Sequence, residues 1–373
     1  MIPLIHSTFY KEGETKKLLT NFISDAKYLS FGKECEQFEQ SFAKWQGRKY
    51  CVFVNSGSSA NLALIQALLN LGRIENKVGF SALTWSTNVM PLIQLGLIPV
   101  PLDVEVDTLN VSSKKLLPVI DSLSVVFLTN LLGLCDDIDE IKRLCDEKNV
   151  LLLEDNCESL GSVYKGKKLG NYGLASTFSF YVGHHMSTIE GGAICTDDEE
   201  LADMLRIVRA HGWDRNLAPE KKTNQSFYSR YTFYDLGYNL RPTEIQGYIG
   251  NTQLPYLDEV VQKRESNFVK LDTPIDTYYP LRYTHMDTFS SFAFPFICKS
   301  TEQRDALVER CKGKIEIRPI VGGDITQQPF FKKYAFSPVN PNADLIHKQG
   351  LYIGNNPELT DSELELIKEV VNG

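Results

Sequence analysis

Small and hydroxyl-bearing residues gather in the run VNSGSSAN (54–61), where an apolar strand-like segment gives way to a helix-like one. Such a junction leaves backbone N–H groups free to bind an anion, and the helix dipole adds positive potential there. The hydroxyl groups of Ser58 and Ser59 would contribute further hydrogen bonds. The run is also consistent with an ordinary helix start capped by Ser56, so alone it indicates a phosphate site only weakly.

Carboxylates follow a second apolar segment, in the run LEDNCE (153–158). A carboxylate such as Asp155 at the end of a buried strand faces a pocket and can hold a protonated ring nitrogen in its cationic state. A strand-terminating turn with capping carboxylates explains the run equally well.

Two adjacent histidines, His184 and His185, lie in the run TFSFYVGHHMSTIEGG (177–192). A lone histidine is more often a structural hydrogen-bonding group than a catalyst, and neighbours in a strand face opposite sides. The pair lacks the i, i+4 spacing and the carboxylate partner of a zinc motif. We therefore expect no metal site.

Short apolar runs alternate with amphipathic segments between residues 50 and 196, a pattern that predicts a mainly parallel sheet covered by helices on both faces. Pockets in such α/β folds lie at the carboxyl ends of the strands, where all three runs are placed. The expected strands are CVFVN (51–55), KVGFS (77–81), PVPLDV (99–104), VVFLTN (125–130), VLLLEDN (150–156), TFSFY (177–181) and GGAICT (191–196).

The C-terminal part has a different pattern. A helix over 198–212 and an aromatic, polar segment precede a long helical stretch from Thr243 to about Leu271 that would bridge two domains. The apolar runs SFAFPFI, KIEIRPIV and GLYIG and a last helix, SELELIKEVV, predict a smaller α+β domain. We place the large domain at residues 1–250 and the small one at 251–373.

Composition limits the class of protein. The 373 residues carry a formal net charge of −8, which argues against general nucleic-acid or membrane-surface binding. Eight scattered cysteines without a CxxC pair indicate reduced thiols, and the N-terminus has no signal-peptide pattern. No run reaches the ~18 apolar residues of a membrane span. We expect a cytoplasmic protein.

Taken together, the three runs closely resemble the DegT/DnrJ/EryC1/StrS sugar aminotransferases, which are fold-type I enzymes dependent on pyridoxal 5′-phosphate (PLP), over nearly the whole chain. The resemblance implies an aromatic side chain on the cofactor ring, Trp85 of ALTWSTN, and a pairing of Asp155 with the ring nitrogen. It also implies a homodimer in which Asn239, of LGYNLR (236–241), reaches the partner's cofactor phosphate. The remaining cofactor residues that it implies are Gly57, Ser58, Ser59 and Ser179 at the phosphate and Glu158 near the ring hydroxyl.

The sequence departs from that family at one decisive position. Counting from Ser179, the lysine that holds the cofactor covalently is replaced by His184. An imidazole forms no stable imine, so PLP and its amine form (PMP) would bind non-covalently. Histidine still transfers protons near neutral pH, because its unperturbed pKa is about 6.5. We therefore predict His184 and Asp155 as the catalytic residues.

The run HHMSTIEGG (184–192) resembles a subgroup of the family, the PLP/PMP-dependent 3-dehydratases of 3,6-dideoxysugar (O-antigen) biosynthesis. One branch binds an iron–sulfur cluster through cysteines, two of them separated by one residue; that spacing is absent here, so we expect no cluster. The other branch implies GDP-4-keto-6-deoxy-D-mannose as substrate, L-glutamate as amino donor, and release of ammonia and 2-oxoglutarate. Its candidate substrate-binding residues are His185, Arg241 and Arg318.

Two alternatives stay open at this stage. The first is a nucleotide-sugar aminotransferase that uses His184 as a proton shuttle and forms an amino sugar. The second is a catalytically silent relative that only binds the cofactor or the sugar. An intact phosphate run, Trp85 and Asp155 argue against the second alternative.

Overall fold

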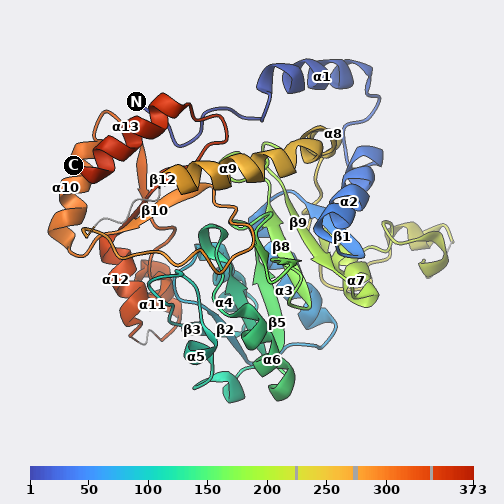
Figure 1. Ribbon diagram of the computed structural model, residues 1–373. Helices are drawn as coiled ribbons and strands as arrows, with labels where there is room; N and C mark the ends of the chain where they lie inside the picture. Colours follow the sequence, from blue (N-terminus) through green and yellow to red (C-terminus); the bar gives the residue numbers. More distant parts are fainter. Residues whose placement is uncertain (223–225, 272–275, 337–338) are drawn as a thin grey trace.

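A central sheet organises the chain. The structure is a computed structural model that describes residues 1–222, 226–271, 276–336 and 339–373. Across these ranges the largest sheet has seven strands in the order β1-β9-β8-β5-β4-β2-β3, and β9 alone runs against the others (Figure 1). The mainly parallel sheet is thus confirmed. Its strands are β1 (Tyr50–Val54), β2 (Lys77–Ser81), β3 (Ile98–Leu102), β4 (Val125–Thr129), β5 (Leu151–Asp155), β8 (Ala175–Ser179) and β9 (Gly192–Thr196).

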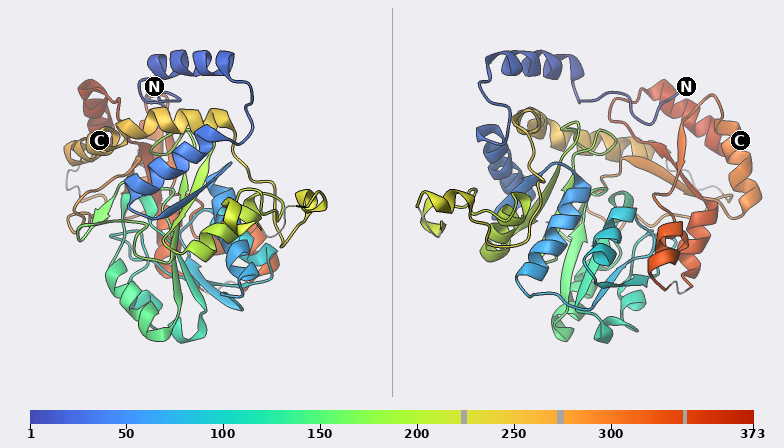
Figure 2. Two further views of the ribbon diagram at one scale, coloured as in Figure 1. Left: turned by 90° about the vertical axis from the view of Figure 1, so that its right-hand side faces the viewer. Right: turned by 180° about the vertical axis from the view of Figure 1, so that it is seen from behind.

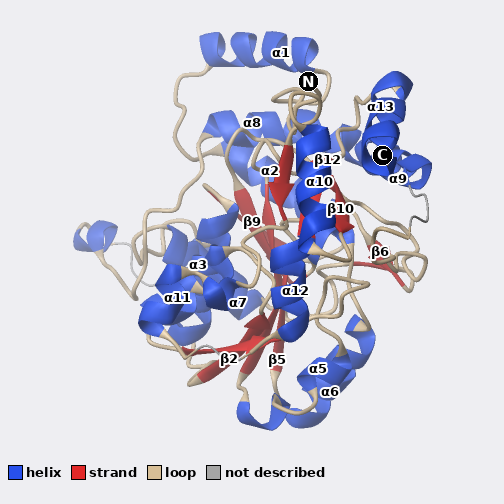
Figure 3. Cartoon of the chain, turned by 90° about the vertical axis from the view of Figure 1, so that its left-hand side faces the viewer, coloured by secondary structure: helices blue, strands red, loops and turns tan. Residues whose placement is uncertain are grey.

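Side chains alternate between the two faces of a strand, and both faces of this sheet are buried. Phe127 and Leu153 pack with α3, α4 and α7, whereas their neighbours Val126 and Leu152 pack on the opposite face, towards α5 and α6. Figure 3 shows α3 and α7 on one side of the strands and α5 and α6 on the other. The covering helices are α2 (Lys33–Gln46), α3 (Gly57–Asn70), α4 (Met90–Gln94), α5 (Ser113–Leu116), α6 (Ile138–Lys148) and α7 (Glu199–Arg209).

A smaller antiparallel sheet, β10-β12-β11, forms the C-terminal α+β part. The N-terminus joins it, because Ile2 pairs with Ile315 as an isolated bridge and is buried in the same core. The expected domain boundary at residue 250 therefore stays a prediction, because the first residues of the chain pack with the C-terminal part. The elements here are β10 (Ala293–Ile297), α10 (Thr301–Cys311), β11 (Ile317–Pro319), α11 (Pro329–Tyr334), α12 (Pro341–Gln349), β12 (Gly350–Gly354) and α13 (Asp361–Asn372).

The long helical stretch expected from Thr243 to Leu271 is wrong as one helix. It consists of α8 (Glu244–Gln253) and α9 (Leu257–Leu271), separated by one 3₁₀ turn over Leu254–Tyr256. Pro255 lies in that turn, and proline removes a helical hydrogen bond and clashes with the preceding turn. The expected bridge survives the break, since α9 runs from the large sheet to the C-terminal part (Figure 1).

Two peripheral features complete the fold. Helix α1 (Glu12–Asp25) packs on α8, where the rings of Phe22 and Tyr248 stack with centroids 4.2 Å apart, and β6 (Val163–Tyr164) pairs with β7 (Lys167–Lys168). The described residues that follow α7, up to 222 and from 226 onwards, project from the body of the molecule (Figure 2). Among the described residues, no helix has both the length and the apolar composition that a membrane crossing requires. All eight cysteines are free, and only Cys157 is not fully buried.

Candidate active site

A cavity of about 700 Å³ opens at the carboxyl ends of β5 and β8, beside the start of α3. This is the edge at which parallel α/β sheets place their ligand sites. Strands β11 and β12 of the smaller sheet close it through Arg318 and Tyr352. The predicted site residues on its wall are Gly57, Ser58, Trp85, Asp155, Glu158, Ser179, His184 and Arg318.

Both interpretations of the run VNSGSSAN, a capped helix start and an anion site, apply to the start of α3. Ser56 caps the helix, with its side-chain oxygen accepting from the Ser59 backbone N–H at 3.1 Å. Gly57 and Ser58, the first two residues of the helix, line the cavity, and N–H groups in a first turn have no intrahelical partner. A Cβ at Gly57 would lie 2.7 Å from Cβ of Ser179, so glycine is needed for this close approach. The result is an anion cradle that a phosphate fits.

Ser59 lies just behind that cradle. Its hydroxyl oxygen accepts from the Ser56 hydroxyl at 3.0 Å, and Ser59 is not on the cavity wall. Its predicted contact with a cofactor phosphate therefore stays a prediction.

Asp155 is buried at the end of β5, and its carboxylate is surrounded by donors. Its Oδ2 accepts from the side-chain amides of Asn88, at 2.6 Å, and Asn61, at 2.9 Å, and its Oδ1 accepts from the backbone N–H of Cys157 at 2.8 Å. These bonds fix the orientation of the carboxylate. A carboxylate held in this way suits a protonated pyridine nitrogen.

Glu158 lies three residues after Asp155 and is also buried, and its surroundings shift the pKa of its carboxyl. Burial raises the pKa of its carboxyl to about 8, the backbone N–H of Leu132 lowers that pKa, and the charge of Asp155 raises it further. The Leu132 N–H donates to Oε2 at 3.3 Å. Glu158 is thus mostly protonated at neutral pH, and its hydroxyl can donate to an oxygen on a bound ring.

Trp85 presents a large apolar surface to the cavity, with 55% of the residue exposed. An exposed indole on a cavity wall provides a face on which a flat aromatic ring can stack. With the anion cradle, Asp155 and Glu158, the donor set therefore fits PLP at its phosphate, ring nitrogen, ring oxygen and ring face.

His184 lies in the turn that follows β8, where its backbone N–H donates to the Tyr181 carbonyl at 2.9 Å. Its ring packs against Phe292, with centroids 5.3 Å apart, and its Nδ1 has no protein partner. Burial, and secondly the charge of Arg264, lower the pKa of the imidazole to about 4. His184 is therefore neutral at physiological pH and able to accept a proton.

An amine that could bind PLP covalently is missing from this wall. Within the part of the chain that the structure describes, no lysine lines the cavity, and His184 occupies the wall beside Ser179 and Glu158. The arrangement can bind a phosphorylated ring, hold its nitrogen charged and move a proton, but it offers no amine tether.

His185 points to a different environment. It is buried, its Nε2 donates to the Ser290 carbonyl oxygen at 2.9 Å, and it lines a second, small cavity rather than the large one. The hydrogen bond fixes the neutral ring with its proton on Nε2. Its predicted contact with substrate stays a prediction, and its observed contacts are structural.

Of the three remaining polar candidates, one lies on the cavity wall and two do not. Arg318 is on its wall, in an ion pair with Glu316. Arg241 and Asn239 are not on it; the Arg241 Nε donates to the Asn239 Oδ1 at 3.0 Å, and Asn239 is exposed. One chain alone therefore leaves the side chain of Asn239 outside its own site.

Sequence reasoning missed the residues that hold Asp155. Asn61 and Asn88 both lie in the quoted runs, three or four residues from a predicted site residue, yet neither received a role. The available signal was the spacing. Each asparagine lies three residues, about one helical turn, after a predicted site residue. No pattern identified Tyr352 or Phe292, because the smaller sheet brings them to the cavity from far along the chain.

Comparison with known proteins agrees with this geometry. A model of the DegT/DnrJ/EryC1/StrS aminotransferase family matches residues 10–372. GDP-4-keto-6-deoxy-D-mannose 3-dehydratase from Escherichia coli O55:H7 is 37% identical over 370 residues, covering 94% of each chain. The enzyme of that name from Yersinia pseudotuberculosis is 36% identical over 369 residues, covering 94% of this chain and 92% of its own.

A solved structure extends the likeness to three dimensions. GDP-4-keto-6-deoxymannose-3-dehydratase with a trapped PLP–glutamate geminal diamine is similar with a TM-score of 0.90 and 36% identity, and the match covers 100% of both chains. Both the family match and these relatives span nearly all of the sequence. The chain belongs to the DegT/DnrJ/EryC1/StrS aminotransferase family.

Proposed function

We propose that this protein is a PLP/PMP-dependent 3-dehydratase that removes the C3 hydroxyl group of GDP-4-keto-6-deoxy-D-mannose, with L-glutamate as amino donor. The observation that carries the proposal is the cavity wall itself, on which residues that fit the phosphate and the ring of PLP lie together with His184 and no described lysine takes part. The relatives named as GDP-4-keto-6-deoxy-D-mannose 3-dehydratases support the choice of substrate.

The cofactor residues divide into four groups, by the part of PLP that each binds. Gly57, Ser58 and Ser179 bind the phosphate, with Ser59 behind them, while Trp85 stacks on the ring. Asp155 keeps the ring nitrogen protonated, and the Glu158 carboxyl donates to the ring oxygen. When bound, the cofactor supplies an electron sink and, as PMP, the amine that reacts with the sugar ketone.

His184 moves the proton. As a neutral imidazole it takes a proton from the C4′ carbon of the cofactor, and it then protonates the C3 oxygen of the sugar as that oxygen leaves. The overall change balances: the sugar C3–OH becomes CH₂, glutamate becomes 2-oxoglutarate, and its nitrogen leaves as ammonia. Without an amine tether, the deoxy sugar is released by hydrolysis rather than as an amino sugar.

The substrate's charged groups require cationic partners at the cavity mouth. Arg318, which lines the cavity, would bind a carboxylate or a pyrophosphate, because a guanidinium fork matches both groups. It would exchange its ion pair with Glu316 for the ligand. We also propose that Arg241 and His185 contact the substrate.

We also propose a homodimer in which each chain completes the partner's site with Asn239. Asn239 is exposed and outside its own cavity. The projecting segment before it carries a cluster of exposed large apolar side chains, a feature that marks interaction surfaces. These are Phe227, Tyr228, Tyr231, Phe233 and Leu236. Free cysteines throughout the chain support a reducing, cytoplasmic location.

The test is a product analysis. The protein is incubated with PLP, L-glutamate and a panel of nucleotide-linked 4-keto-6-deoxy sugars, and products are analysed by mass spectrometry and by ammonia and 2-oxoglutarate assays. We expect a sugar lacking one oxygen, with equimolar ammonia, and the highest kcat/KM with the GDP sugar. An amino sugar would favour an aminotransferase. PLP binding without 2-oxoglutarate formation would indicate a catalytically silent protein.

A further inference from the structure

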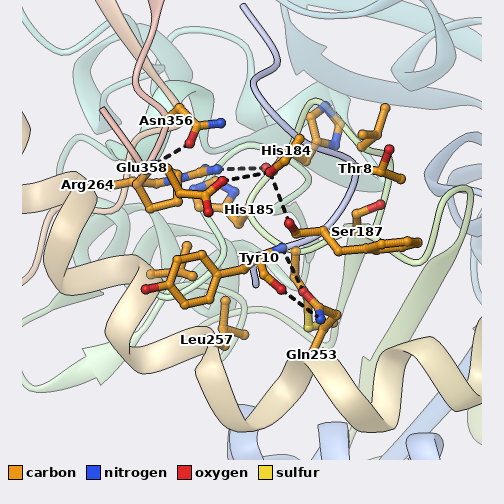
Figure 4. Close-up of a pocket in the computed structure, with 16 residues that line it drawn as sticks. Thr8, Tyr10, His184, His185, Ser187, Gln253, Leu257, Arg264, Asn356 and Glu358 are labelled. Carbon is orange, nitrogen blue, oxygen red and sulfur yellow. Dashed lines mark hydrogen bonds between the residues drawn. The ribbon is translucent and has the colours of Figure 1, made fainter. Parts of the chain in front are cut away.

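A second, small cavity of about 40 Å³ lies beneath the turn that carries the two histidines (Figure 4). Its walls come from the N-terminal residues 7–10, the turn 182–187, the segment Gln253–Arg264 and the loop 356–358. A water-sized sphere needs roughly 10–15 Å³ of such volume, so the cavity has room for about three or four of them, or for one small ion. His184 lines both this cavity and the large one.

The cavity contains a buried positive charge. Arg264 of α9 lies on its wall and is only 5% exposed. Its Nη2 donates to the His184 carbonyl oxygen at 2.9 Å, whereas Nε and Nη1 have no protein partner. Among the described residues, no carboxylate forms an ion pair with Arg264. Burial lowers the pKa of this guanidinium to about 9, which leaves it charged at neutral pH.

A buried charge without a counter-ion is costly, and buried charges in proteins are normally paired. Glu358, the carboxylate on the cavity wall, is exposed and accepts a hydrogen bond from the Ser7 hydroxyl at 2.8 Å; it does not form an ion pair with Arg264. Water can accept hydrogen bonds from the free Nε and Nη1 of Arg264, but it cannot neutralise the charge of the guanidinium.

We propose that this cavity is a binding site for one small monovalent anion, chloride under ordinary conditions, which acts as the counter-ion of Arg264. The ion accepts hydrogen bonds from Nε and Nη1 while Nη2 continues to hold the His184 carbonyl. The link between α9 and the active-site turn remains the hydrogen bond from Arg264 to the His184 carbonyl. The charge of Arg264 also lowers the pKa of His184, and a neighbouring anion offsets that effect.

The test uses the cofactor-free protein, so it does not rest on the proposed function. Thermal unfolding is measured at constant ionic strength while sodium gluconate, whose anion is too large for the cavity, is replaced by sodium chloride or bromide. We expect a saturable rise in Tm of about 1–3 °C. Crystals soaked in bromide should give an anomalous difference peak within hydrogen-bond distance of the Arg264 guanidinium.

Three variants make the test specific. Arg264→Met should abolish the halide-dependent shift without lowering Tm in gluconate, because it removes an unpaired charge at similar volume. Arg304→Met, which removes an arginine paired with Asp305, should keep the full shift. Glu358→Gln should keep or strengthen it. If Arg264→Met does not fold, Arg264→Lys should show the same shift at higher halide concentrations.

The proposal is overturned if wild-type protein shows no saturable halide effect, if Arg264→Met shows the same shift as wild type, or if the bromide peak lies elsewhere. A shift lost in Glu358→Gln would assign the counter-ion to that carboxylate and would equally overturn it.

Discussion

Asn88 donates a hydrogen bond of 2.6 Å from its side-chain amide to Oδ2 of Asp155, the carboxylate at the end of β5. Asn61 donates to the same oxygen from α3. The carboxylate proposed to hold the ring nitrogen is thus oriented by Asn61, which is not on the cavity wall, and by Asn88, which is.

Replacing Asn88 by alanine should weaken PLP binding. A hydrogen bond to a charged group is worth about 1.5–3 kcal/mol, so the Kd for PLP should rise by about 10-fold to 100-fold. Fluorescence titration measures the change, and Asn88→Asp should be worse because it adds a like charge beside Asp155. An unchanged Kd in Asn88→Ala would show that Asp155 needs no such support.

Replacing His184 by asparagine should lower the dehydration rate by about 10²–10⁴-fold, the usual contribution of general acid–base catalysis. The Kd for PLP should change little, because the phosphate, ring-nitrogen and stacking contacts are intact. Steady-state kinetics with the GDP sugar and a PLP titration give both values. Wild-type rates in this variant would remove His184 from the mechanism.

The neighbouring histidine should behave differently. His185→Asn removes a buried hydrogen bond to the Ser290 carbonyl, which we expect to lower stability by about 1–3 kcal/mol. Its kcat should fall far less than that of His184→Asn, because His185 is not on the large cavity's wall. Urea unfolding and kinetics on the same preparations separate the two effects; equal losses of kcat would assign both imidazoles to catalysis.

Glu158 makes stability depend on pH in a predictable direction. Since burial raises its pKa to about 8, the protonated form stabilises the cofactor-free protein; this contribution is complete below about pH 4.5 and is lost as the pH rises to 8. Glu158→Gln should therefore gain stability over wild type across this range, by about 1–3 kcal/mol at pH 8.

Urea unfolding at several pH values checks this prediction, with Glu147→Gln, an exposed residue of α6, as control. The Glu158→Gln enzyme should also keep most of its activity at pH 7, because an amide N–H donates as the carboxyl O–H does. A pH-independent difference between variant and wild type would mean that Glu158 is ionised throughout.

Mixed dimers test the position of Asn239. If Asn239 works in trans, heterodimers of Asn239→Ala and His184→Asn chains contain one intact site. Random pairing of equal amounts should then restore about a quarter of the wild-type sites. Co-expression with two affinity tags isolates the heterodimer for assay. No recovery from two inactive parents would place Asn239 in its own chain's site, and an active Asn239→Ala parent would place it outside any site.

The sequence contained enough information for the large sheet because its signals are local. Buried strands such as β4 and β5 are short apolar runs, and site residues such as Asp155 lie at their carboxyl ends. The break between α8 and α9 was also readable at Pro255, but the helical periodicity on both sides concealed it.

Other parts of the site depend on packing between distant segments. Arg264 and His184 are 80 residues apart, and nothing in the sequence of α9 indicates that its arginine is buried without a carboxylate. The same holds for Tyr352 and Phe292, which the smaller sheet brings to the cavity. Periodicity predicts which face of a helix or strand a residue occupies, but it does not predict which distant residue it contacts there.

The most direct measurement concerns the bond between protein and cofactor. Wild-type protein loaded with PLP is treated with sodium borohydride, denatured and analysed by intact-mass spectrometry, with His184→Lys as a positive control. We predict that wild type shows the mass of the bare polypeptide, whereas His184→Lys gains one reduced cofactor. A stable cofactor adduct on wild-type protein would contradict the replacement of the lysine by His184, and with it the proposed dehydration.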